Sequence, residues 1–439
     1  GVAIQRTGFD SGLRVVTDRM PAVRSVAIGF WVLAGSRDEE PRISGASHFL
    51  EHLLFKGTKT RSALDIAEAF DAVGGDLNAF TAKETTCFYA RVRDRDLPMA
   101  IDHLADMLQH STVRKADLDA ERQVILEEIN MHEDAPDEVV HDLFTETLWP
   151  GHPLGRPILG TRDTIENATG ERIRRFYGKY YVPGNVVVAA AGNLQHDQLI
   201  AELRRRVDTG RILRGGGTFN RRAAGEAPVS SAASLVRRRK TEQAHICIGT
   251  DGLSRTDPDR FAFLVVNTAL GGGMSSRLFQ QIREKRGLAY AVYSYQSQFT
   301  EAGQWVAYAG TTPSRAQEVV GLIRAEIGAL AGGGLLKDEF ERAKGHVKGS
   351  IVLSLEDPSS RMSRIGKSEI AQGEILTVDQ TLRRIQAVTI DDARRVAQRV
   401  LSRPMTLTVL GPFGARAFAS ASPSRRAAKR SSEGSGRAS

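Results

Sequence analysis

The segment Val186–Gly192 reads VVVAAAG, and the segment Met405–Gly411 reads MTLTVLG. Each is a short run of apolar and β-branched residues that ends in glycine, a pattern typical of a buried β-strand. Upstream, GSRDE at Gly35–Glu39 resembles LSRTD at Leu253–Asp257, and the two pairs of segments have nearly equal offsets along the chain. A motif order that recurs at one fixed offset indicates an internal duplication. The sequence therefore predicts two tandem homologous domains.

The rest of the first half alternates between strand-like and helix-like stretches. Leu13–Thr17 and Ser25–Leu33 are rich in apolar and β-branched residues, and a turn at Pro21 separates them, so we expect a hairpin. The predicted fold class is α+β, each domain being an antiparallel-rich sheet flanked by helices. Further strands are expected at Asp76–Ala82 and Thr85–Val92, and helices at Ser44–Phe55, Ala63–Val73, Leu97–His110 and Ala116–Met131.

The length of 439 residues also favours more than one domain, because a single core rarely grows beyond about 250–300 residues. We place the first domain at residues 1–213 and the second at residues 243–413. Residues 214–242, rich in glycine and arginine, are predicted to be a linker with a strand near its end. Residues 414–439 are predicted to be a disordered basic tail, since they hold too few apolar residues to form a core.

The net charge of +8 does not indicate a nucleic-acid-binding protein, because much of the excess lies in the predicted tail. No apolar stretch approaches the roughly 20 residues that span a bilayer, so no membrane association is expected. The two cysteines, Cys87 and Cys247, are too few for a disulfide framework. We therefore expect a cytoplasmic location.

The candidate chemistry lies in GASHFLEHLLFKGT at Gly45–Thr58. His48, Glu51 and His52 are spaced i, i+3 and i+4, which places all three side chains on one face of a helix. Two imidazoles one turn apart can bind a divalent metal ion such as Zn²⁺, and the carboxylate beside them can act as a general base. This H-x-x-E-H order is the inverted zincin motif.

A catalytic zinc site needs a third protein ligand, and LDAERQVILEEINMHED at Leu118–Asp134 offers several. Glu121 and Glu128 fall on one stripe of the predicted helix, two turns apart. One could bind the metal while the other orients a ligand. Helical geometry alone does not decide between Glu127 and Glu128 as the ligand.

These motifs give the chain a resemblance to a known family. It resembles the inverted zincin metallopeptidases that include pitrilysin, insulin-degrading enzyme and mitochondrial processing peptidase, and most of all their bacterial single-chain members. The resemblance extends from about Leu13 to Gly411. Besides the two stretches above, it rests on GGDLNAFTAKETTCFYARV, HPLGRPILGT and GGGMSSRLFQQIREKRGLAY.

The resemblance implies roles for individual residues. It makes His48, His52 and Glu128 the ligands of one Zn²⁺ per chain, Glu51 the general base and Glu121 an assisting carboxylate. It also implies that an extended peptide substrate adds to a strand edge at Asn78 and Ala79. In the second domain, which lacks the metal motif, Arg283 and Tyr290 are expected to contact the substrate carbonyl.

The resemblance further implies a zinc metalloendopeptidase that hydrolyses unfolded peptides inside a chamber. In the family four such domains enclose the chamber, so a two-domain chain is expected to form a homodimer in which Arg283 and Tyr290 act in trans. Two substrate classes stay open, presequences cut near arginine and short peptides of any sequence. The alternative function is a non-catalytic structural homologue, like the core subunits of respiratory complexes, but those have eroded metal motifs.

Overall fold

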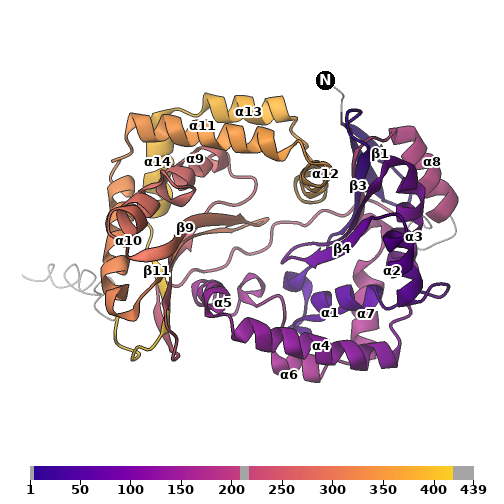
Figure 1. The fold of residues 1–439 in the computed structure, drawn as a ribbon, viewed down its shortest axis with the longest axis horizontal. Helices are drawn as coiled ribbons and strands as arrows, with labels where there is room; N and C mark the ends of the chain where they lie inside the picture. The colour runs from indigo at the N-terminus through magenta and orange to yellow at the C-terminus, as the bar shows by residue number, and fades with distance from the viewer. Residues whose placement is uncertain (1–3, 208–216, 419–439) are drawn as a thin grey trace, which may run out of the picture.

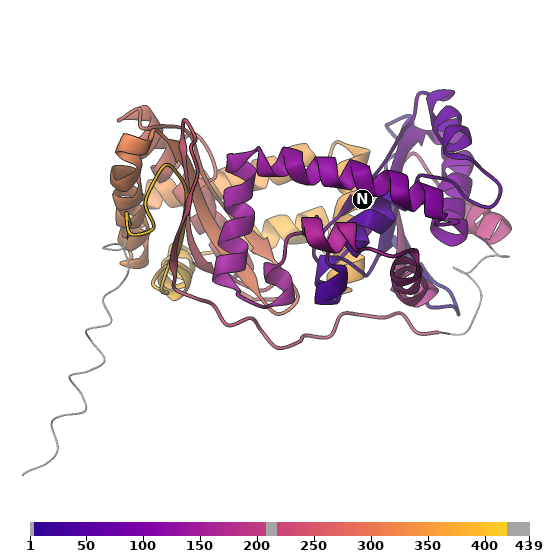
Figure 2. The same ribbon diagram turned by 90° about the horizontal axis from the view of Figure 1, so that it is seen from below.

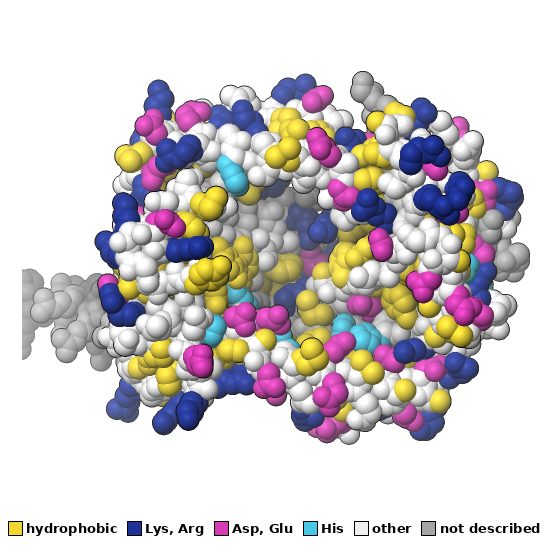
Figure 3. Space-filling model, in the orientation of Figure 1, with side chains coloured by type: hydrophobic (Ala, Val, Ile, Leu, Met, Phe, Trp, Pro, Cys, Tyr) yellow, Lys and Arg dark blue, Asp and Glu magenta, His cyan; other side chains and the backbone are white. Residues whose placement is uncertain are grey.

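A computed structural model describes residues 4–207 and 217–418, which form two halves around a central hollow (Figures 1 and 3). Each half is built on one β-sheet. The first sheet contains β1 (Gln5–Gly8), β2 (Arg14–Arg19), β3 (Ser25–Val32), β4 (Asp76–Thr81), β5 (Thr86–Arg93) and β6 (Val186–Gly192). The second contains β7 (Ser234–Arg238), β8 (Ala244–Asp251), β9 (Ala289–Gln298), β10 (Gly303–Thr311) and β11 (Thr406–Gly411).

The two sheets share one topology. The strand order is β1-β2-β6-β3-β5-β4 in the first and β7-β11-β8-β10-β9 in the second. Apart from β1, the orders match strand for strand. The directions match as well, because β2 with β6 and β7 with β11 are parallel while the other corresponding pairs are antiparallel. The predicted fold class, two tandem α+β domains, is confirmed.

One predicted pairing is wrong. β2 and β3 do not form a hairpin, because β6 lies between them, parallel to β2 and antiparallel to β3. All seven residues of β6 are buried. A strand this apolar is most stable in the middle of a sheet, where both of its edges are hydrogen-bonded and both of its faces are covered. That long-range partner displaces the pairing expected between sequence neighbours.

Helices cover the sheets (Figure 1). The first core packs mainly α1, α3 and α7 against one face of the first sheet, and the second core packs α9, α10 and α14 against the second sheet. Among the described residues no helix is both long and apolar enough to cross a membrane. The helices of the first half are α1 (Ala46–Leu54), α2 (Ala63–Asp71), α3 (Leu97–His110), α4 (Lys115–Glu133), α5 (Pro136–Leu148), α6 (Arg162–Glu166), α7 (Gly170–Tyr180) and α8 (His196–Val207). Those of the second are α9 (Arg260–Gly271), α10 (Ala316–Ala331), α11 (Lys337–Ser354), α12 (Pro358–Lys367), α13 (Val378–Ala387) and α14 (Ile390–Leu401).

The two halves exchange helices. α5 follows α4 in the first half but packs on β8 and β11 of the second sheet, where Phe144 and Trp149 are buried. Reciprocally, α12 comes from the second half and packs on β2, β3 and β6 of the first sheet, burying Met362 and Ile365 beside Trp31. Each sheet thus has one face covered by a helix from the other half, and the halves are joined by apolar packing.

Ion pairs also join the halves, and they involve the repeated motifs. Glu84 of the first half is 4% exposed and lies 2.5 Å from Arg37 Nη1 and 2.9 Å from Arg255 Nη2. These are the arginines of GSRDE and LSRTD. Arg37 also pairs with Glu301 of the second half, and the backbone amide of Thr300 donates to Glu84. Two equivalent residues of the duplicated sequence therefore converge on one carboxylate.

The connection between the halves lies at the edge of the molecule. Residues 217–233 run across from the first half to the second without a helix or strand (Figure 2). The strand β7 lies within the range predicted as linker, at its end. The described chain continues past residue 413, since Phe418 is buried in the second core. The rest of the predicted tail, residues 419–439, lies outside the described residues.

Candidate metal centre

Gly45 and Glu39 fix the N-terminal end of α1, the helix that carries the H-x-x-E-H motif. Gly45 precedes α1 with a φ of 95°, and a Cβ there would lie 2.7 Å from the Leu159 carbonyl oxygen, so the position requires glycine. The buried Glu39 carboxylate accepts hydrogen bonds from the amides of Gly45 at 2.8 Å and Ser47 at 2.7 Å. Burial raises the pKa of Glu39 to about 7, and these two bonds oppose that rise. Glu39 therefore caps the helix.

The two histidines of α1 face the same side. Phe49, Leu50 and Leu53 are buried in the first core, which fixes the rotation of the helix about its axis. The rings of His48 and His52 then lie next to each other, with centroids 4.6 Å apart. Burial, and to a lesser degree the charge of His52, lowers the pKa of His48 to about 4. His48 is thus neutral at pH 7, the form in which imidazole binds a metal.

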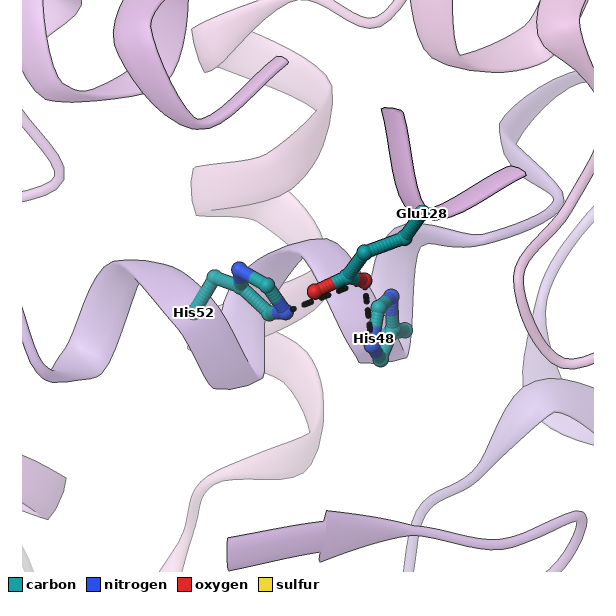
Figure 4. A group of neighbouring side chains, drawn as sticks. All are labelled: His48, His52 and Glu128. Atoms are coloured by element: carbon teal, nitrogen blue, oxygen red, sulfur yellow. Dashed lines mark ion pairs between the residues drawn. The ribbon is translucent and has the colours of Figure 1, made fainter. Parts of the chain in front are cut away.

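Glu128 of α4 completes the cluster (Figure 4). Its Oε2 lies 3.5 Å from His48 Nε2 and 3.6 Å from His52 Nε2. The three ligand atoms all lie within 4.8 Å of one another, the one such group among the described residues. Tetrahedral Zn²⁺ with ligands at about 2.0–2.2 Å requires donor atoms roughly 3.3–3.6 Å apart. The donor set and both distances from the Glu128 oxygen therefore fit zinc. Glu127, the alternative, is exposed and outside the cluster.

Glu121 forms a hydrogen bond with His52, one of the two histidines of the cluster. It lies two turns before Glu128 on α4, and its side chain is 5% exposed. Its Oε2 lies 2.9 Å from His52 Nδ1, and its Oε1 pairs with Lys56 at 2.6 Å. A carboxylate on Nδ1 selects the tautomer that leaves Nε2 free and raises its basicity. His48 Nδ1 is buried without a comparable partner in the described structure.

Glu51 lies beside the cluster, close enough for the charges of His52 and Glu128 to act on its carboxyl group. Its carboxylate accepts a hydrogen bond from the Thr81 hydroxyl at the end of β4. Burial raises the pKa of Glu51, while the bond from Thr81 and the charge of His52 partly offset that rise. A raised pKa improves a carboxylate as a proton acceptor near neutral pH, because the proton is held more strongly.

The residues predicted to bind substrate fall in two places. Asn78 and Ala79 lie on β4, which ends the first sheet and, among the described strands, pairs with β5 alone. Arg283 and Tyr290 lie in the second half, where the guanidinium stacks on the phenol ring with its carbon 4.7 Å from the centroid. The Tyr290 side chain is highly exposed. Among the described residues, neither forms a hydrogen bond or ion pair with His48, His52 or Glu128 of the same chain.

The comparison with known families decides the classification. Residues 14–162 match the family described as "Insulinase (Peptidase family M16)", and residues 167–346 match the "Peptidase M16 inactive domain". An "uncharacterized zinc protease" of Streptomyces coelicolor is 52% identical over 419 residues, covering 93% of this chain and 90% of the relative. The chain belongs to peptidase family M16. The resemblance stated from its motifs is thereby confirmed.

Other proteins are similar to the chain in sequence or in fold. The "uncharacterized zinc protease YmxG" of Bacillus subtilis is 42% identical over 412 residues, 94% of this chain and 99% of the relative. The crystal structure of an M16 inactive domain from Pseudomonas fluorescens aligns with a TM-score of 0.86 at 20% identity, over 94% of this chain and 99% of that one. A protease from Helicobacter pylori aligns with a TM-score of 0.84 at 21% identity, over 93% and 99%. Identities this low show the shared fold.

Sequence reasoning missed three residues that support the centre of this M16 chain. Lys56 comes four residues after His52, just past the end of α1, a spacing that could have suggested a link to the same carboxylate. Thr81 contacts Glu51 only because β4 packs beside α1. Glu39 caps α1 from a preceding loop. The last two contacts depend on tertiary structure, and no local signal marks them.

Proposed function

We propose that this M16 chain is a zinc-dependent endopeptidase that hydrolyses unfolded peptides. The observation that carries the proposal is the cluster of His48, His52 and Glu128, whose ligand atoms lie within 4.8 Å of one another with the Glu51 carboxylate beside them. The relatives named zinc proteases support the assignment. A non-catalytic structural homologue would have no need to keep this set of ligands together.

The roles of the side chains follow from their positions. His48, His52 and Glu128 would hold Zn²⁺, which when bound supplies Lewis acidity that lowers the pKa of water and polarises a carbonyl. Glu51 accepts the proton of the attacking water and returns it to the leaving amine. Thr81 keeps the Glu51 carboxylate in place, and Glu121 keeps the His52 ring in place.

The substrate is proposed to bind as an additional strand. β4 has a free edge among the described strands, and Thr81 at its end contacts Glu51, so a peptide along this edge would pass the metal cluster. Backbone hydrogen bonds from the Asn78–Ala79 stretch would hold an extended chain with little demand on its sequence. This mode of binding suits unfolded peptides and excludes folded proteins.

A dimer is proposed to complete the site. Arg283 and Tyr290 lie stacked on each other and do not bond the metal cluster of their own chain in the described structure. Their guanidinium and phenol groups are suited to stabilise the oxyanion that develops on a substrate carbonyl. We propose that they reach the metal cluster of a second copy, and that the two copies together enclose the chamber.

The test is zinc analysis together with cleavage of a mixed peptide library by the wild type and Glu51→Gln. We expect the variant to retain stoichiometric zinc, because Glu51 is not a ligand, and to lose nearly all turnover. Cleavage by the wild type at one arginine-containing motif would indicate presequence processing, and broad cleavage would indicate general peptide degradation. Equal turnover in both proteins, or a wild type that binds no zinc, would contradict the proposal.

A further inference from the structure

A polar cavity of about 210 Å³ lies in the second half, away from the metal cluster. It is bordered by the first turn of α9, the end of β9, α12 and the short π-helical segment that follows α12 at Ser368–Gln372. A volume of this size accommodates a small ion with several water molecules. Its polar lining residues include Arg260, Gln296, Gln298, Arg364, Ser368 and Thr381.

Among the described residues, the two arginines of this cavity have no carboxylate partner. Arg260 donates to the backbone oxygen of Asp257 at 3.0 Å, and Arg364 donates to the Leu376 backbone oxygen and, at 3.0 Å, to the Thr381 hydroxyl. Neither forms an ion pair in the described part of the chain. Both are partly buried, and burial lowers the pKa of each below its usual value. Partly buried guanidinium groups normally pair with an anion.

The three acids whose charges act on these arginines are already paired elsewhere. Asp257 pairs with Arg399 at 2.7 Å. Glu374 pairs with Arg384 and Asp18 with Arg361, each at 3.3 Å. Each nearby carboxylate is therefore matched by a different arginine. The charges of Arg260 and Arg364 are left in excess at the cavity.

Other groups at the cavity also favour a negative ligand. Gln298 borders the cavity, and its buried Nε2 has no hydrogen-bond partner in the described structure. The side-chain oxygen of Gln296 is likewise unpartnered, and a 180° rotation of that amide places a donor in the same position. Arg260 is the first residue of α9, a helix of 12 residues, whose N-terminal end carries a partial positive charge.

We propose that this cavity binds a small oxyanion, either a phosphate group or a carboxylate, between Arg260 and Arg364. The planar guanidinium groups suit the oxygens of both anions. The site joins two parts of the molecule, because Arg260 begins α9, which packs in the second core, while Arg364 belongs to α12, which packs on the first sheet. A bound anion would therefore strengthen the joint between the halves, whatever substrate the metal centre takes.

The test is thermal unfolding of the full chain in increasing inorganic phosphate, with sodium chloride adjusted to constant ionic strength. A ligand that binds the folded state raises the unfolding midpoint in a saturable manner. We expect phosphate to raise the midpoint by a few degrees. The parallel arm uses N-acetylglycine, whose carboxylate imitates a peptide C-terminus. Saturation by phosphate alone identifies a phosphate site, and saturation by N-acetylglycine alone identifies a carboxylate site.

Variants decide whether the effect arises in this cavity. Arg364→Gln and Gln298→Ala should each weaken binding at least tenfold by calorimetric titration of the folded protein. The control is Arg324→Gln, which removes a partly buried arginine of α10 that has no ion pair in the described structure and lies outside the cavity. The proposal is overturned if neither anion gives a saturable shift, or if both cavity variants respond like the control.

Discussion

His52 is held on both sides of its ring, with Nδ1 2.9 Å from Glu121 Oε2 and Nε2 3.6 Å from Glu128 Oε2. Both carboxylates come from α4, so one helix supplies the third ligand and also orients the second. The position of α4 relative to α1 therefore determines the whole cluster.

Replacing Glu121 should weaken zinc binding without removing a ligand. In Glu121→Gln the neutral amide is a weaker acceptor for His52 Nδ1, so we expect zinc affinity to fall about 10–100-fold. The measurement is competition with a chromogenic chelator. The matched control is Glu127→Gln, which removes one carboxylate from the exposed side of the same helix and should change the affinity little. Equal affinities of the two variants would show that Glu121 does not support the site.

Replacing Glu39 should destabilise the fold at the start of α1. The Glu39 carboxylate accepts from the backbone amides of Gly45 and Ser47. In Glu39→Gln the side-chain NH₂ group must face one of these amides, so two hydrogen-bond donors point at each other in the protein interior. We expect a loss of about 1–3 kcal/mol in the free energy of unfolding, measured with urea. Glu40→Gln, at an exposed neighbour paired with Arg42, is the control and should be nearly neutral. A neutral Glu39 variant would contradict the capping role.

Two glycine substitutions should have opposite effects on stability. Gly366 of α12 lies against Trp31, and an added Cβ would come within 2.2 Å of the indole Nε1. We expect Gly366→Ala to destabilise the chain by about 1–3 kcal/mol, because the contact between α12 and the first sheet must open. Gly345 of α11 has open space around it, so Gly345→Ala should stabilise the chain by about 0.5–1 kcal/mol. Denaturant unfolding of both variants measures these changes, and a tolerated Gly366→Ala would argue against tight packing of α12.

The ion pairs at Glu84 should make stability depend on acidic pH. Burial opposes the ionisation of Glu84, but the charges of Arg255 and Arg222 and the bonds from Thr300 and Arg37 outweigh it and hold the pKa below its ordinary value. A carboxyl whose pKa is lowered in the folded state stabilises the protein above its unfolded pKa. That stabilisation disappears as the pH falls through the folded pKa.

Glu84→Gln tests this dependence. We expect it to cost about 3–5 kcal/mol at pH 7, because Arg37 and Arg255 lose a buried partner. The difference from the wild type should shrink as unfolding is measured from pH 7 down to pH 3, since below its ordinary pKa the Glu84 carboxyl takes up a proton in the unfolded wild type and the stabilisation begins to be lost. A difference that is constant over this range would exclude the ionised carboxylate as the cause.

Much of the architecture could be predicted from the sequence, because it rests on local patterns. Apolar periodicity located the helix of the H-x-x-E-H motif, and recurring segments revealed the duplication that both sheets display. The pairing of β2 with β3 was wrong for a physical reason. Strand partners are chosen by burial in the complete sheet, and the apolar β6 competes for the position between them.

Helical spacing predicted that His48, Glu51 and His52 share one face of a helix. It left open the choice between Glu127 and Glu128 as the third ligand, which only the family resemblance decided. That choice depends on how α4 is rotated against α1, which the contacts of Ile125 and Ile129 with the core determine. The crossing of α5 and α12 could not be predicted. An amphipathic helix shows that one of its faces is buried, but its sequence does not say which sheet will cover that face.

The reciprocal placement of α5 and α12 bears on how the chain could be divided. A cut between residues 217 and 233 would divide the chain into two fragments. The first fragment would then lack α12, which covers its sheet, and the second fragment would lack α5. Expressed alone, each fragment would present a bare apolar surface and aggregate. Expressed together, the fragments should reassemble. The two halves of the duplicated chain therefore depend on each other to fold.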